Sequence, residues 1–247
     1  MKEKKYLSRR QKARRSLIVL LLLGLLFAAS GVYGILPGHA IRAAEALTDC
    51  RPTTVVRRLG WVRLPRSMLN QVYLCENEDC LLFVVAKFQL WKGWHTSDPG
   101  VVDCTGEAPV HAGIHIIWSS WNDTNSREYT SMEDYIEAYA AGQYDVMRYY
   151  AYGRVEDYRA MSVRVRRTWE TNGGREMAIE TEIPRSQWIW KDGRPYFVEE
   201  ILYWETGDSF CEDAKDGTLE WQVQLLDERG GVLYEAAVQD WPTLLSA

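Results

Sequence analysis

The stretch VRVRRTWETNGGREMAIETEI, residues 163–183, decides the fold more clearly than any other part of this chain. Apolar and polar residues alternate on both sides of Asn172-Gly173-Gly174, a pattern typical of two half-buried strands joined by a glycine turn. A three-residue loop pairs odd positions with odd positions, so that apolar residues face apolar residues and arginines face glutamates. The expected pairs are Trp169 with Met177, Val165 with Thr181, Val163 with Ile183, Arg166 with Glu180, and Arg164 with Glu182.

This register makes two predictions about single residues. Gly174 supplies the positive φ that three-residue hairpin loops require. Arg167 falls across from Ile179 on the apolar face, and it is the one residue there that does not fit the pattern.

Strand patterns also surround this hairpin and predict a mainly antiparallel β region. One further hairpin joins 188–190 to 196–198 through Asp192-Gly193, and another joins 219–225 to 232–234 through a glycine turn. Before them, strands are expected near 55–56, 72–75, 81–91 and 114–118. Because residues 196–205 are apolar on both faces apart from Glu199, Glu200 and Glu205, we expect a central strand that is covered on both sides.

A helical segment is expected inside this β region. Thr130-Ser131-Met132-Glu133 forms a capping box, and apolar residues at helical spacing follow it as far as Gly142. Residues 144–152 extend the aromatic pattern and suggest a second helix. The predicted fold class is therefore α+β: a sandwich-like or single-sheet antiparallel β domain with an inserted helical segment.

The N-terminus indicates a membrane segment. Eight basic residues and one acidic residue lie in 1–16, and Leu17–Leu36 then gives twenty uncharged residues before Pro37. Such a helix reaches about 30 Å, the hydrocarbon thickness of a bilayer. We expect a single transmembrane helix over 17–36, with the N-terminus in the cytoplasm and the remainder outside.

A cleaved signal peptide is the alternative to this membrane anchor. The strongest apolar core, Leu17–Phe27, is short, and small-residue cleavage patterns follow it near Ser30, Ala40 and Ala46. In that case the protein is secreted. The expected organisation is a basic tail over 1–16, the apolar segment over 17–36, a stalk over 37–49 and an extracytoplasmic β-rich domain over 50–247.

Charge excludes one class of partner. The tail carries +7 and the whole chain −5, which leaves −12 on the remainder. Nucleic-acid binding needs clustered lysine and arginine, so nucleic acid is not expected as a partner. The expected partners are the lipid bilayer, through 17–36, and a protein or glycan outside the membrane.

Five cysteines follow the apolar segment, and an exported setting permits disulfides between them. Cys75 and Cys80 lie in strand-like segments joined by the polar turn 76–79. We predict a disulfide between these two. The pairing of Cys50, Cys104 and Cys211 stays open.

Two histidines suggest possible metal chemistry. His111 and His115 are four residues apart, a spacing that places them on one face of a helix or strand. With His95, Asp103 or Asp123 as a third ligand, they could bind zinc or another divalent metal, but ordinary structural histidines are the favoured explanation of the pattern. No cofactor is implied by any motif.

Tryptophans offer candidate binding residues. Trp91, Trp94, Trp118 and Trp121 lie near glycine, serine, asparagine and aspartate, which predicts exposure on loops. Trp188 and Trp190, two residues apart, are expected to share one strand face. The alternative, favoured for most of the tryptophans, is that they fill the core or lie near the membrane interface.

These features favour a non-catalytic binding or scaffolding domain of the cell envelope. The alternatives are an exported metal-dependent hydrolase that uses His111 and His115, or a subunit of an envelope assembly or transport complex. The sequence leans against an enzyme, because it lacks a nucleophile elbow, a phosphate loop and a dinucleotide fingerprint.

Overall fold

The computed structural model describes residues 9–29, 34–61, 69–90, 93–96, 99–120, 145–171, 173–205, 220–238 and 240–241. Its helices are α1 (Arg9–Ala29) and α2 (Pro37–Leu47), with a short 3-10 helix at Arg185–Gln187. Its strands are β1 (Thr54–Trp61), β2 (Leu69–Glu76), β3 (Cys80–Gln89), β4 (Gly93–His95), β5 (Gly100–Asp103), β6 (Val110–Ser120), β7 (Asp145–Val155), β8 (Ser162–Glu170), β9 (Glu176–Pro184), β10 (Ile189–Lys191), β11 (Arg194–Glu205), β12 (Glu220–Leu226), β13 (Val232–Val238) and β14 (Asp240–Trp241).

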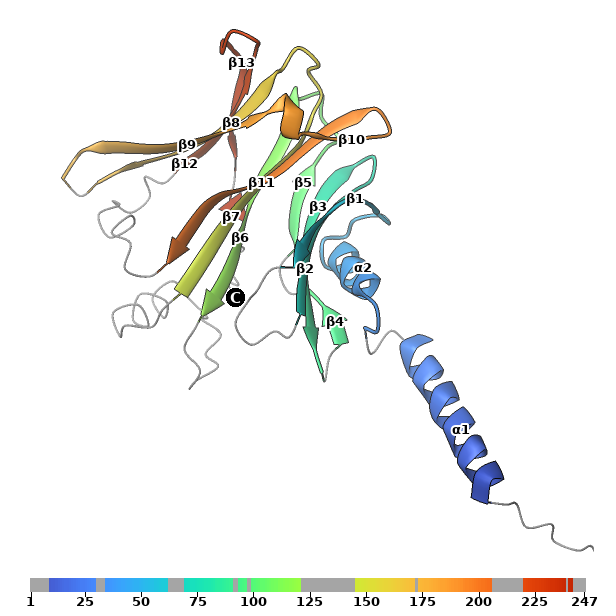
Figure 1. Ribbon diagram of the computed structural model, residues 1–247. Helices are drawn as coiled ribbons and strands as arrows, with labels where there is room; N and C mark the ends of the chain where they lie inside the picture. Colours follow the sequence, from blue (N-terminus) through green and yellow to red (C-terminus); the bar gives the residue numbers. More distant parts are fainter. Residues whose placement is uncertain are drawn as a thin grey trace, which may run out of the picture.

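The strands form three sheets, which are mostly antiparallel, as the sequence predicted (Figure 1). Sheet A has the order β1-β2-β3, and β4 and β5 pair with successive parts of β3. Sheet B has the order β10-β11-β7-β6-β14, and sheet C the order β13-β12-β8-β9. Among the described pairings within the sheets, only the short β14 runs parallel to its neighbour, β6.

Sheet B is the middle layer of the stack. Fully buried residues between sheets B and C include Ile114, Val163, Phe197, Val223 and Leu225. Those between sheets A and B include Val72, Leu74, Phe83, Tyr152 and Tyr196. Because neighbouring residues of β11 point to opposite faces, Phe197 meets sheet C and Tyr196 meets sheet A. The central strand expected from residue 196 onward is thus covered on both faces at its start.

The β8–β9 hairpin confirms the predicted register pair by pair, from Val163 across Ile183 to Trp169 across Met177. Arg166 and Arg164 form ion pairs with Glu180 and Glu182 on the outer face. Gly174 has a φ of 76°.

Arg167 lies across from Ile179 and is only 4% exposed. Its guanidinium carbon sits 5.1 Å from the ring centres of Tyr149 and Trp221. Cation–π attraction therefore accommodates the charge on the apolar face.

The other two hairpins also form, as β10–β11 and β12–β13. The tight turn of the first uses positive φ at both Asp192 (50°) and Gly193 (78°). The predicted second helix at 144–152 is wrong, because β7 occupies this segment and pairs with β6 on one edge and β11 on the other. Tyrosines suit such a doubly paired strand. The predicted helix at 130–142 lies outside the described residues.

The prediction of one transmembrane helix over 17–36 is wrong. The first seven positions of α1 carry five basic residues, and the uncharged remainder, 16–29, reaches only about 21 Å. Beyond it, Gly34 pairs with Gly93 of sheet A and Pro37 begins α2. Within the described residues, no helix combines the length and the apolar character that crossing a membrane requires.

The segment expected as a stalk contains α2, which packs against the outer face of sheet A. Ala40 and Ala44 are fully buried there, against a cluster that includes Leu82 and Val84 of β3. The small alanine side chains let the helix approach the sheet closely. Residues 37–47 are therefore part of the folded domain in this structure.

The structure does not bring Cys75 and Cys80 together as a disulfide would require. The register of β2 and β3 places Cys75 across from Leu82, so that Cys80 is its diagonal neighbour. Diagonal pairs lie about 7–8 Å apart, whereas a disulfide needs Cβ atoms within about 3.5–4.5 Å. Both thiols are free, and no disulfide is formed among the described cysteines.

Candidate functional site

The two candidate metal ligands lie inside the protein, between sheets A and B. His111 and His115 are 6% and 3% exposed, and both point from β6 toward sheet A. Four residues along a strand correspond to about 13 Å, whereas ligands of one zinc ion each lie about 2 Å from it. A strand conformation therefore separates the two imidazoles too widely to share an ion.

The proposed third ligands do not complete a metal site. Nδ1 of His111 lies 3.1 Å from the backbone oxygen of Asp103, and the Asp103 carboxylate accepts hydrogen bonds from Thr105. His95 belongs to β4, and Asp123 lies outside the described residues. No group of three potential metal ligands occurs in the described part of the chain.

Burial also fixes the charge of His115. The loss of solvation lowers its pKa to about 3, with a smaller contribution from the positive charge of Lys87. Its ring lies 4.7 Å, centre to centre, from that of Phe83. His115 is thus neutral at physiological pH and behaves as a packed aromatic ring.

Tyr152 completes what we call the buried histidine cluster: His111, His115 and Tyr152. Burial raises the pKa of Tyr152 above its usual value, and among the described residues no hydrogen-bond partner reaches its hydroxyl. A Cβ at Gly100 would lie 2.6 Å from that hydroxyl and 2.9 Å from Nδ1 of His115. The cluster is therefore sealed by close packing and leaves no space for a substrate.

The tryptophan predictions have mixed outcomes. Trp94 is only 8% exposed, because it pairs with Phe88 and packs in the cluster beneath α2, so the prediction of a loop-exposed ring is wrong for this residue. Trp118 lies in β6, and Trp91 and Trp121 lie outside the described residues. These three stay predictions.

A different group of side chains is exposed, and we call it the Arg185 patch. Its members are Tyr158, Met161, Arg185 and Trp190. Tyr158, Met161 and Trp190 are 56%, 43% and 48% exposed. The Nη1 of Arg185 donates to the backbone oxygen of Tyr158 (2.9 Å) and lies 3.8 Å from the Met161 sulfur.

The guanidinium of Arg185 is also held by two rings. Its carbon lies 5.8 Å from the centre of the Trp188 ring and 5.3 Å from that of Trp190. Trp188 is buried and donates from its Nε1 to the Ile183 backbone oxygen, so of the two rings only Trp190 is exposed to solvent. The two rings were expected on one strand face, but they differ in exposure, and Trp188 lies just before β10.

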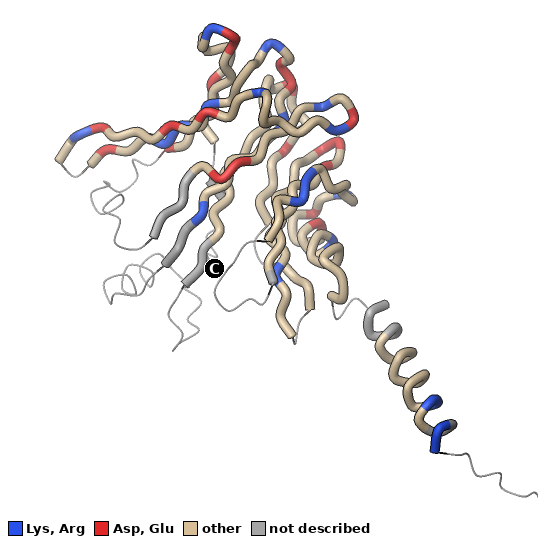
Figure 2. Tube along the Cα trace, in the orientation of Figure 1, with Lys and Arg blue, Asp and Glu red and all other residues tan. Residues whose placement is uncertain are grey.

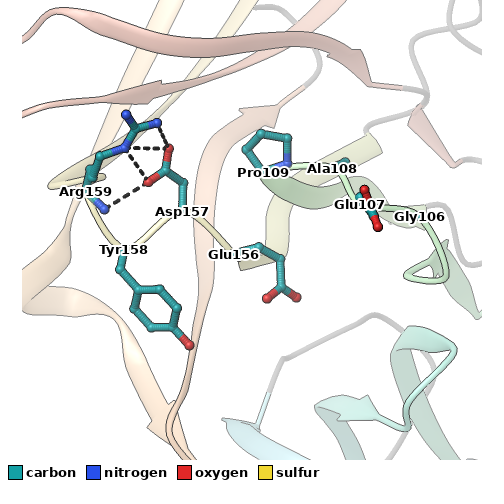
Figure 3. Close-up of a pocket in the computed structure, with 8 residues that line it drawn as sticks. All are labelled: Gly106, Glu107, Ala108, Pro109, Glu156, Asp157, Tyr158 and Arg159. Carbon is teal, nitrogen blue, oxygen red and sulfur yellow. Dashed lines mark hydrogen bonds and ion pairs between the residues drawn. The ribbon is translucent and has the colours of Figure 1, made fainter.

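An open hollow of about 650 Å³ adjoins this patch and shares Tyr158 with it (Figure 3). Its lining residues are Gly106, Glu107, Ala108, Pro109, Glu156, Asp157, Tyr158 and Arg159. The backbone nitrogens of Glu156 and Asp157 both donate to the Pro109 oxygen, which joins the two loops.

Electrostatics distinguish the hollow from the patch. Figure 3 shows Arg159 folded back onto Asp157 while the Tyr158 ring points away. The hydrogen bonds from Arg159 hold the pKa of Asp157 below its usual value. Two of the three carboxylates in the hollow form ion pairs, Asp157 with Arg159 and Glu156 with Arg154. The patch, by contrast, is centred on a cation without an ion-pair partner among the described residues.

The patch therefore combines cationic and aromatic character without groups for chemistry. Arginine, tryptophan and tyrosine are the residue types that dominate binding energy at protein interfaces, and methionine is enriched there. No pair of a nucleophile and a base occurs among its four residues. The arrangement suits recognition.

Comparisons with known proteins give no family. The chain matches no family model. It also has no match among the curated proteins or the solved structures. The site must therefore be interpreted from its own geometry.

Sequence reasoning missed the patch for a physical reason. Arg185, Trp188 and Trp190 are close in the chain, and the Asp192-Gly193 turn could have indicated an exposed hairpin end. Tyr158 and Met161 come from the β7–β8 connection, however, and only tertiary contacts place them against Arg185.

Proposed function

We propose that this chain is a non-catalytic binding protein that docks a protein partner through the Arg185 patch. The observation that supports the proposal is the way in which the Arg185 side chain is held without an ion-pair partner among the described residues. Its guanidinium is held in place at the surface beside an exposed tryptophan, and no carboxylate in the described part of the chain forms an ion pair with it.

The side chain of Arg185 is ordered before binding. Nη1 bonds to the backbone oxygens of Tyr158 (2.9 Å) and Ala160 (3.4 Å), and the tryptophan rings hold the guanidinium plane. A side chain that is already fixed loses little conformational entropy on association. This order favours a docking role over that of a merely solvated surface charge.

The free donors of Arg185 indicate the chemistry of the partner. An arginine has five N–H donors, and the hydrogen bonds of Arg185 to described residues use only Nη1. A carboxylate can take up the remaining donors in a bidentate pair. The exposed faces of Tyr158, Met161 and Trp190 suit apolar groups around it. The partner segment is thus an acidic side chain flanked by apolar residues.

The hydrolase alternative finds no matching geometry. His111 and His115 are buried and widely separated along β6, and the His115 ring packs against that of Phe83. A substrate could not reach them without separating sheets A and B. The exposed patch is the better explanation of function.

We propose further that the chain works at the surface of a cell membrane. Residues 17–23 of α1 are all exposed, by 48–65%, and all are apolar. Figure 2 places the basic residues of α1 at its N-terminal end, where they can meet anionic headgroups. Contact of α1 with lipid would hold the β domain close to the bilayer.

Vesicle flotation tests this location. The full-length protein should float with vesicles that contain phosphatidylglycerol, and Leu20→Asp with Leu22→Asp should reduce the bound fraction at least tenfold. Equal flotation of the wild type and the variant would contradict lipid contact through α1.

Photo-crosslinking in the native cells tests the docking proposal. A benzoylphenylalanine that replaces Trp190 should yield a discrete adduct with one protein, which Arg185→Glu should remove. The matched control replaces Val232, which is 52% exposed on β13 and lies outside the patch. Adducts of equal yield from both positions, or an adduct that a glycosidase digests, would overturn the proposal of a protein partner.

A further inference from the structure

Two free thiols lie in contact on the α2 side of sheet A. The Sγ atoms of Cys50 and Cys80 are 2.9 Å apart. Non-bonded heavy atoms such as carbons normally approach only to about 3.5–4.0 Å, and a disulfide has a sulfur–sulfur distance of about 2.0 Å. The sulfurs thus need to move by only about 0.9 Å to bond.

Polar contacts hold the two chain segments together at this point. Arg51 forms an ion pair with Asp79 (3.3 Å), and the side-chain nitrogen of Asn77 donates to the Arg51 backbone oxygen (2.9 Å). The side-chain oxygen of Asn77 also accepts the backbone N–H of Cys80 (2.8 Å). These contacts around the β2–β3 turn therefore hold the two cysteines close to each other.

The other described thiols are directed elsewhere. Cys75 is fully buried across from Leu82. Cys104 is buried in the cluster between sheets A and B, and its Sγ lies 3.6 Å from the Val102 backbone oxygen. Cys50, which is partly exposed, is the member of the pair that a reagent can reach.

We propose that Cys50 and Cys80 are a thiol modification site that becomes a disulfide by exchange with a disulfide-bearing oxidant. The Cys50 thiolate attacks one sulfur of the oxidant, RSSR, whose S–S bond breaks and releases RS⁻. The Cys80 sulfur then attacks Sγ of Cys50, forms the internal S–S bond and releases the second RS⁻. The two thiol protons end on the two RS⁻ groups, so two cysteines are oxidised and RSSR is reduced to two RSH.

The environment of Cys80 agrees with this order of attack. Burial raises the pKa of Cys80 to about 12, and the neighbouring Cys50 thiol contributes in the same direction. Thiolates are the attacking species, so the buried Cys80 is the poorer first nucleophile. The resulting bond would fix the chain after α2 to the start of β3. It would thus anchor the helix on sheet A.

Peptide mapping of the full chain tests the proposal. The protein is incubated with glutathione disulfide or with dithiothreitol, alkylated and digested without reduction. Cleavage after arginine, lysine and glutamate separates the cysteines, because Glu76 and Glu78 lie between Cys75 and Cys80. The oxidised sample should contain peptide 46–57 linked to peptide 79–87, with the loss of two hydrogen atoms.

Thermal unfolding gives a second measurement. Oxidation should raise the Tm of the wild type by roughly 4–16 °C. Cys50→Ser should have a Tm within about 2 °C of the reduced wild type, and glutathione disulfide should not change it.

Two results would overturn the proposal. The first is alkylation of both Cys50 and Cys80 as free thiols after treatment with glutathione disulfide. The second is a link from either of them to Cys75, Cys104 or Cys211 in its place.

Discussion

The buried histidine cluster and the Arg185 patch differ in both residue types and environment. His111, His115 and Tyr152 are sealed between sheets A and B, whereas Tyr158, Met161 and Trp190 surround Arg185 at the surface. The residue types that suggested chemistry are hidden, and the residue types that suit binding are exposed.

This difference separates side chains that fill the core from side chains that we propose bind a partner. Burial keeps His115 neutral and leaves the Tyr152 hydroxyl without a described hydrogen-bond partner, so the cluster acts as core. Changes to Tyr158, Met161 or Trp190 should cost little stability, because these side chains already face solvent. Stability and recognition should therefore separate between the two regions.

Phe83→Ala should produce the largest effect. The fully buried Phe83 ring lies 4.7–5.5 Å from the rings of His115, Tyr150 and Tyr152, so it lies at the centre of the packing between sheets A and B, which we call the seam. Its removal should lower the free energy of unfolding by about 3–5 kcal/mol in urea denaturation. The control Val232→Ala should lose less than about 0.5 kcal/mol. A loss below about 1 kcal/mol for Phe83→Ala would show that the seam is not tightly packed.

His115 should make the stability depend on pH. The unfolded imidazole takes up a proton near pH 6.5, whereas the folded one does so only near pH 3. Between these values the unfolded chain binds more protons, so the free energy of unfolding falls as the pH falls. From pH 7.5 to 5 this residue should account for a loss of about 2 kcal/mol.

Urea denaturation at both pH values checks this effect. His115→Gln should lose about 2 kcal/mol less than the wild type does over the same change, while the surface variant Val232→Ala should lose as much as the wild type. An equal loss in wild type and His115→Gln would show that His115 is not held neutral.

Tyr152→Phe should have a smaller effect, in the opposite direction. A buried hydroxyl without a hydrogen bond is unfavourable, so its removal should leave the free energy of unfolding unchanged or raise it by up to about 1 kcal/mol. The matched control is Tyr150→Phe. The hydroxyl of Tyr150 donates to Glu200 at 2.7 Å, and its loss should cost about 1–3 kcal/mol. Equal costs for both variants would mean that Tyr152 has a hydrogen-bond partner in solution.

Trp190→Ala should also change stability little. The ring is 48% exposed, and its attraction to Arg185 is worth only about 0.5–1 kcal/mol at such a site. Thermal unfolding should thus shift by no more than about 4 °C. A larger loss would show that the patch is part of the core and would weaken its assignment as a binding surface.

The hairpin at 163–183 could be predicted to the residue because its pairing is local. Alternation on both faces and a glycine turn allowed only one register. By contrast, the pairing of β12 with β8 joins segments more than fifty residues apart and depends on packing that no local pattern encodes. The tyrosines of β7 have the spacing of a helix in sequence, and only pairing on both edges makes them a strand.

The candidate site was less predictable than the fold. Composition cannot tell an exposed tryptophan from a buried one. Trp94 was therefore predicted to be exposed although it is buried, and Trp190 was not predicted as a binding residue although it is exposed. Likewise, Cys75 and Cys80 were expected to lie opposite each other across the β2–β3 turn, whereas the segment after α2 places Cys50 next to Cys80. The Cys50–Cys80 contact joins segments 30 residues apart, whereas the Cys75–Cys80 prediction failed because the β2–β3 register makes these two cysteines diagonal neighbours.

Quantitative co-purification from the native cells tests the central claim most directly. It measures the amount of the protein crosslinked from position 190 that accompanies the wild type, Arg185→Glu and Tyr152→Phe, with the folding of each variant checked by circular dichroism. We predict at least a tenfold loss for Arg185→Glu and no loss for Tyr152→Phe. Undiminished binding by Arg185→Glu, or a loss confined to Tyr152→Phe, would contradict the assignment of function to the exposed patch.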